Sequence, residues 1–119
     1  MTRTQTFAAF GYPAEASRYS GSLPFNGAYQ REATSASSGA GDNIYSGWVG
    51  PNAMMIKSYM TEGCSGGGWL IALGSNGLGH VNGHNDYHYA SGPKVNPSHM
   101  FSPYYGPEAL NLFNFSRKL

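Results

Sequence analysis

The stretch TEGCSGGGWL, residues 61–70, places a serine inside a run of glycines. Backbone N–H groups in a tight glycine turn can bind the oxyanion that forms during acyl transfer. Gly63 and Ser65 can direct their N–H groups at one point if Gly63 adopts a conformation that other residues resist. Gly66 and Gly67 leave room for another backbone or for a substrate. The stretch therefore indicates either a nucleophilic serine or a flexible turn with no chemistry.

The length and composition exclude several classes of protein. A chain of 119 residues predicts a single domain, 1–119, with one core. Charged residues make up 11% and the formal net charge is +1, which predicts no nucleic-acid partner and no binding to a membrane surface. No apolar run reaches the ~20 residues of a membrane span. The N-terminus lacks the pattern of a signal peptide. The single cysteine, Cys64, cannot form an internal disulfide.

Apolar patterning and turn signals predict a mostly β fold. Residues 4–12 are expected to form a first strand, and residues 14–43 a long loop or loosely paired hairpin, most flexible at 35–41. The turn Gly74-Ser75-Asn76-Gly77 is a hairpin signal. A helix is expected at 107–113, because Pro107 suits a first turn. The remaining strands are expected at 44–49, 53–60 and 68–73, with a return through 78–89.

Four segments in order resemble the second half of trypsin-like (chymotrypsin-fold) serine proteases, particularly a group of secreted microbial members. Residues 60–69, MTEGCSGGGW, look like the nucleophile loop of those enzymes, often written MTGGSSGGPW. Residues 10–14 (FGYPA) resemble the passage that opens this half. Residues 83–87 (GHNDY) and 100–106 (MFSPYYG) resemble the substrate-binding strand and the approach to the terminal helix.

The resemblance implies a fold, a location and a set of site residues. The fold would be all-β, a six-stranded antiparallel β-barrel with a C-terminal helix, in an extracellular protein without a cofactor or metal. Ser65 would be the catalytic nucleophile, and the N–H groups of Gly63 and Ser65 would form the oxyanion site. The peptide or protein substrate would contact five residues, with the first at the base of the pocket: Tyr59, Glu62, Asp86, Tyr87 and His88.

The general base and its orienting aspartate belong to the first barrel in that family, and the resemblance covers only the second. A serine hydroxyl without a base is a poor nucleophile at neutral pH. We therefore expect half of a serine endopeptidase, with the base and acid supplied by a partner chain. A barrel without its neighbour also exposes an apolar face, which favours such a partner or a homo-oligomer. Whether this chain is an enzyme by itself stays open.

Two other functions stay open. The chain could be a non-catalytic β-barrel module for binding or self-assembly. It could also be a metal-binding β-protein that uses His80, His84 and His88, since alternate residues of a strand share a face. Asn82 and Asp86 would lie on the same face, and Asp86 could orient a neighbouring histidine as a base for Ser65. The histidine candidates for that base are His80, His84, His88 and His99.

Cys64, beside the serine, has two interpretations. Backbone amides in a tight turn can lower the pKa of a thiol and make it reactive. A lone cysteine is more commonly a small buried residue that fills space in a core.

Overall fold

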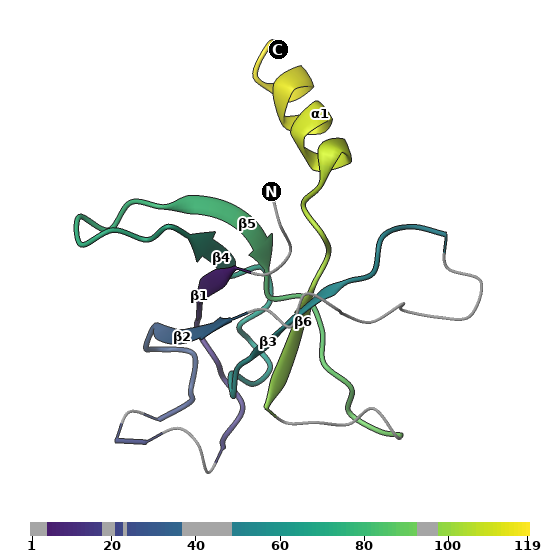
Figure 1. The fold of residues 1–119 in the computed structure, drawn as a ribbon. Helices are drawn as coiled ribbons and strands as arrows, with labels where there is room; N and C mark the ends of the chain where they lie inside the picture. The colour runs from purple at the N-terminus through teal and green to yellow at the C-terminus, as the bar shows by residue number, and fades with distance from the viewer. Residues whose placement is uncertain (1–4, 18–20, 23, 37–48, 93–97) are drawn as a thin grey trace.

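The structure is a computed structural model that describes residues 5–17, 21–22, 24–36, 49–92 and 98–119. Within these ranges the chain is mostly β with one C-terminal helix, as the sequence predicts. These residues form six strands and one helix, and Figure 1 shows the helix projecting away from the strands. In chain order they are β1 (Thr6–Gly11), β2 (Arg31–Ala36), β3 (Met54–Lys57), β4 (Gly68–Ile71), β5 (His80–His84), β6 (His99–Ser102) and α1 (Pro107–Ser116).

The larger sheet has four antiparallel strands in the order β2-β1-β4-β5. Strand β1 lies inside it and pairs with β2 along its whole length, from Thr6 opposite Ala36 to Gly11 opposite Arg31. On its other side Ala8 lies opposite Leu70 in β4. Because β4 begins at Gly68, directly after the serine–glycine stretch, this sheet holds the end of that stretch in place.

The core lies where the larger sheet meets the pair β3-β6. Phe7 and Trp69 are fully buried, and their rings meet edge to face with centroids 5.5 Å apart. Met54 and Ile56 from β3 and Met100 from β6 complete the cluster. Edge-to-face aromatic pairs add to the stabilisation from burial alone. Trp69 therefore fixes the start of β4 in the core.

The strands do not form the closed six-stranded barrel that the resemblance implies. Strands β3 and β6 form a separate two-stranded sheet, and no strand pairing joins β5 to β6 or β2 to β3 in the described residues. At the end of β5, the N–H of His84 donates to the hydroxyl Oγ of Ser102 at 2.9 Å instead of to a β6 carbonyl. Pro103 follows directly and has no N–H to extend β6. After the end of β5, an isolated bridge pairs Tyr87 with Phe101 of β6.

The boundaries of the other elements differ in places from those expected. Strand β2 lies within the region predicted as a loop or loose hairpin, and β6 was not predicted as a strand. The helix begins at Pro107 as expected but continues to Ser116, where the Ser116 hydroxyl donates to the Leu112 carbonyl. The strand expected at 44–49 lies outside the described residues except for Val49, which is in no strand, and residues 37–41 of the segment 35–41 expected to be most flexible also lie outside them.

The helix α1 buries none of its residues in this chain. Leu110 and Phe113 are 59% and 60% exposed, and further apolar side chains, Leu112 and Phe115, are also exposed. A helix held only by its own hydrogen bonds is marginal at this length, because most helical stability comes from packing of an apolar face. Its face is therefore suited to an interaction. Among the described residues there is no helix with the length and apolar character to cross a membrane.

Candidate active site

The serine stretch forms a turn that depends on glycine. Gly63 has a φ of +98° and Gly66 a φ of +80°, conformations that other residues resist. A methyl group on Gly63 would also lie 2.8 Å from the Ala14 Cβ and 3.0 Å from the Tyr12 carbonyl oxygen. The conformation that the sequence required of Gly63 is therefore present.

The N–H groups of the turn fall into two sets. Those of Cys64, Gly66 and Gly67 donate to the carbonyls of Thr61, Asn85 and Cys64. Those of Gly63 and Ser65 donate to no described residue, and both residues are exposed. An oxyanion site requires N–H groups that are available to donate to the oxyanion, and these two N–H groups lie two residues apart in the turn.

Asn85, which sequence analysis did not single out, ties this turn to the sheet. Its side chain is buried, accepts a hydrogen bond from Trp69 Nε1 at 2.7 Å, and donates to the carbonyls of Phe10 and Cys64. Its backbone pairs with Gly66 and Gly67. In the sequence, Gly66 and Gly67 indicated that another backbone or a substrate could approach the turn closely. They did not indicate which segment of the chain would do so.

A cavity of about 220 Å³ lies beside Ser65. It brings together four of the predicted substrate-binding residues, Glu62, Asp86, Tyr87 and His88, with the predicted nucleophile. The other residues that line it are Thr61, Cys64, Asn85, Ala90 and Met100.

Tyr59 does not lie at the base of this cavity, where the resemblance implied it would be. It is 45% exposed and lines a different cavity with Phe25 and Arg31. Around it, Ser58 and Met60 are buried, so the alternation of side chains in an extended backbone directs Tyr59 away from the core.

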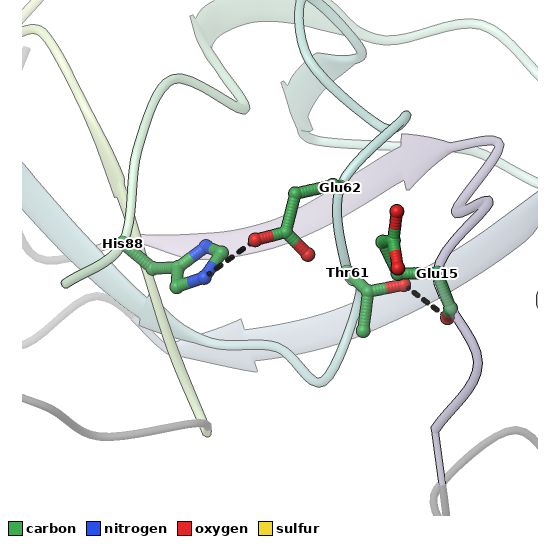
Figure 2. A network of polar contacts seen from close by, with 4 residues as sticks. All are labelled: Glu15, Thr61, Glu62 and His88. Carbon is green, nitrogen blue, oxygen red and sulfur yellow. Dashed lines mark hydrogen bonds and ion pairs between the residues drawn. The ribbon is translucent and has the colours of Figure 1, made fainter. Parts of the chain in front are cut away.

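A polar contact crosses one side of the cavity. Nε2 of His88 lies 3.2 Å from Oε1 of Glu62, which joins the segment after β5 to the turn that carries Ser65 (Figure 2). On the other side of the turn, the Thr61 hydroxyl donates to the Glu15 carbonyl at 2.7 Å (Figure 2). The Ala14 N–H donates to the Glu62 carbonyl at 2.7 Å. The turn is thus held from both neighbouring segments.

An aromatic cluster supports another wall of the cavity. The rings of Tyr87 and Phe101 are stacked, with centroids 4.9 Å apart and an interplanar angle of 8°. Tyr89 meets both rings edge on. The Phe101 carbonyl accepts hydrogen bonds from the N–H groups of Asp86 and Tyr87. The path of residues 86–87 along the cavity is therefore fixed by β6.

Strand β5 ends at His84, so Asp86 and His88 lie beyond it and are not part of one strand face shared with His80 and His84. Nδ1 of His84 lies 2.7 Å from the Tyr105 hydroxyl, and His88 pairs with Glu62. Within the described ranges, no three His, Cys, Asp or Glu side chains are grouped to hold a metal ion. The arrangement gives the metal-binding hypothesis no support.

Cys64 is buried and has the character of a space-filling residue. Burial raises the pKa of its thiol to about 11, and the negative charge of Glu62 acts in the same direction. The reactive species is the thiolate, which forms only as the pH rises toward that pKa. The interpretation of Cys64 as a reactive thiol is therefore not favoured.

This pKa leads to a prediction for thiol chemistry. At pH 8 the folded chain should react with iodoacetamide at least about 100-fold more slowly than the chain in urea, because both the thiolate fraction and access are reduced. The difference should shrink as the pH rises from 9 toward 11, where the folded-state thiol ionises. Mass spectrometry of the quenched reaction measures both rates. Equal rates in the folded and unfolded chain would contradict the buried position of Cys64.

Comparison with known proteins supports the protease resemblance. No family model matches the sequence, and no curated protein matches it. Two solved structures match nearly the whole chain. A thermostable serine protease, AL20, from an extremophilic microorganism is 31% identical with a TM-score of 0.70, over 98% of this chain and 44% of its own. The protease Anisep from Arthrobacter nicotinovorans is 30% identical with a TM-score of 0.69, over 97% of this chain and 44% of its own.

The predicted resemblance to microbial trypsin-like serine proteases is thus confirmed. The chain spans less than half the length of the two proteases that it matches.

Proposed function

We propose that this chain carries the nucleophile, the oxyanion site and the substrate pocket of a serine endopeptidase. Ser65 would attack the carbonyl carbon of a peptide bond, and the N–H groups of Gly63 and Ser65 would bind the resulting oxyanion. Collapse of this tetrahedral intermediate would expel the amine and leave an acyl group on Ser65 Oγ. Water would then release the acid. The observation that carries the proposal is that the N–H groups of two exposed residues, Gly63 and Ser65, donate to no described residue and lie beside a cavity lined by Ser65.

The general base and its orienting aspartate come, in this proposal, from the part of the protease fold outside these 119 residues. In the resembling family they belong to the first barrel, whether joined to this segment or present as a separate chain. Of the in-chain histidine candidates, His84 contacts the Tyr105 hydroxyl and His88 contacts Glu62. An extracellular site of action is part of the same proposal, since the group that the sequence resembles is secreted.

The exposed apolar face of α1 is suited to contact with another domain or another chain in this arrangement. Together with Val81 and Tyr105, the side chains of Leu110 and Phe113 line a cavity of about 820 Å³. Exposed apolar surface of this kind marks an interaction site in soluble proteins. The same face supports a second candidate function, a binding or self-assembling β-module. A chain that forms a stable homo-oligomer through α1 and cleaves nothing would have that function instead.

A cleavage assay tests the first proposal. The protein is isolated from the cells that make it, so that any bound chain is retained, and is incubated with a mixed peptide library. We expect internal peptide bonds to be cleaved, and cleavage to be lost when Ser65 is replaced by Ala. A folded protein that cleaves no peptide, either as isolated or after addition of its bound chains, contradicts the proposal.

The charges of the cavity predict a preference for basic side chains at the cleaved residue. Its ionisable side chains other than Cys64 and Tyr87 are two carboxylates, Glu62 and Asp86, and the imidazole of His88. Asp86→Asn should lower kcat/KM about three- to tenfold for a peptide with Lys at that position. The rate for the neutral analogue with norleucine should not change. Glu108→Gln, which removes an exposed acid on α1, is the matched control. An unchanged ratio of Lys to norleucine in Asp86→Asn would contradict the prediction.

A further inference from the structure

The side chain of Asn85 uses its hydrogen-bonding groups on three different segments. Trp69 Nε1 can only donate, so the atom it contacts is Oδ1, at 2.7 Å. The two carbonyl contacts must then be made by Nδ2, which donates to Phe10 at 2.8 Å and to Cys64 at 3.0 Å. The residue is 1% exposed, so its side chain is shielded from bulk solvent. The orientation of the carboxamide is therefore fully determined.

The bond to Cys64 acts on the peptide unit that carries the Ser65 N–H. The C=O of Cys64 and the N–H of Ser65 belong to one planar peptide, and no cis peptide bond occurs in the described residues. In a trans peptide these two groups point in opposite directions. The N–H of Gly67 also donates to the Cys64 carbonyl, at 3.1 Å. A carbonyl held by two donors fixes the direction of the N–H on the other side of the same peptide.

Two glycines make the space in which the carboxamide lies. A methyl group on Gly67 would lie 2.8 Å from Asn85 Nδ2, and one on Gly11 would lie 3.0 Å from it. The backbone of Asn85 meets the turn as well, because its N–H donates to Gly67 and its carbonyl accepts from Gly66, both at 2.8 Å. The carboxamide is thus enclosed between β1, β4 and the turn, and cannot rotate without breaking these contacts.

We propose that Asn85 is a positioning residue that sets the direction of the Ser65 N–H by holding the Cys64 carbonyl. This deepens the proposed function and rests on it, because the direction of that N–H matters for catalysis only if Ser65 is the nucleophile. Asn85 touches neither the substrate nor the reacting atoms in this role. It acts through the Cys64–Ser65 peptide.

The substitution Asn85→Asp tests the role with little change in shape. It retains an oxygen that can accept from Trp69 and replaces the donor Nδ2 by an oxygen that, in the carboxylate, only accepts. The readout is the one-bond residual dipolar coupling of the Ser65 amide in a weakly aligned, 15N-labelled sample, which reports the direction of the N–H. We expect the Ser65 coupling to change markedly while those of Phe7 and Ile71 keep their values. Asn76→Asp, the same change in an exposed turn, should leave all three unchanged.

The same variants give a catalytic readout in the protein isolated with its bound chains. The rate of Ser65 acylation by a fluorophosphonate at saturating reagent should fall about 10- to 100-fold in Asn85→Asp, with the half-saturating concentration unchanged. A folded Asn85→Asp variant with an unaltered Ser65 coupling overturns the proposal. The coupling does not depend on activity, so a wild-type protein that is never acylated contradicts the proposed function and leaves the positioning test intact.

If Asn85→Asp does not fold, a measurement on the wild-type chain still tests whether Asn85 holds the Cys64 carbonyl. The two carboxamide protons of Asn85 should exchange with solvent at least about 100-fold more slowly than those of the exposed Asn76, because they are bonded to buried carbonyls. Exchange as fast as that of Asn76 would mean that the bond to Cys64 is not made in solution, and the proposal would be overturned.

Discussion

Gly67→Ala is expected to abolish folding or to lower the free energy of unfolding by more than about 3 kcal/mol. The added methyl carbon would lie 1.9 Å from the Phe10 carbonyl oxygen and 2.8 Å from Asn85 Nδ2. Both neighbours are fixed, the first by the backbone of β1 and the second by its buried hydrogen bonds. The clash can therefore be relieved only by separating the turn from the sheet.

The adjacent residue provides the control for this experiment. A methyl group on Gly68 would meet no atom within 4 Å, so Gly68→Ala should change the unfolding free energy by no more than about 1 kcal/mol. Urea unfolding followed by far-UV circular dichroism measures both variants against the parent. Equal midpoints for Gly67→Ala and Gly68→Ala would mean that the turn does not pack on β1 as described.

Ser65→Ala is expected to reduce peptide cleavage by more than about 1,000-fold while leaving the protein folded. The large effect on rate follows from loss of the nucleophile. The other hydroxyl groups in the lining of the cavity belong to Thr61 and Tyr87. Thr61 is not a substitute, because its hydroxyl donates to the Glu15 carbonyl. The small effect on stability follows from the exposure of Ser65 and its lack of a hydrogen bond to any described residue.

Ser75→Ala is the matched control, since Ser75 lies exposed in the turn between β4 and β5. Its cleavage rate should equal that of the parent. Rates are compared as kcat/KM on a single peptide, after circular dichroism has established that each variant is folded. If Ser65→Ala keeps more than a tenth of the parent activity, Ser65 is not the nucleophile.

The sequence predicted the elements whose apolar residues are regularly spaced. Strands β1, β3 and β4 and the helix all lie in the segments expected for them. Strand β2 was missed because its residues, REATSA, are polar or small and become a strand only by pairing with β1. Strand β6 is four residues long and ends before Pro103. Four residues are too few for an alternating apolar pattern that would predict a strand from the sequence alone.

The backbone conformation of the candidate site was predictable where it depends on one local turn. Gly63 and Ser65 needed only the order of residues in TEGCSGGGWL, because the positive φ at Gly63 is a local property. The position of Tyr59 apart from the cavity beside Ser65 could not be predicted, because its direction depends on which neighbours enter the core, and here Ser58 and Met60 do. The role of Asn85 depends on Phe10, 75 residues away, and on Trp69. Contacts of this range do not follow from spacing in the sequence.

Labelling with a fluorophosphonate, which reacts with activated serines and requires no knowledge of the substrate, tests the role of Ser65 most directly. The protein isolated with its bound chains and the purified chain alone are treated in parallel, and the modified peptide is mapped by mass spectrometry. We predict one phosphonate per chain, on Ser65, in the isolated protein, and its absence in Ser65→Ala. A folded, isolated protein that takes up no phosphonate, or takes it up on another residue, would contradict the assignment of Ser65 as a nucleophile.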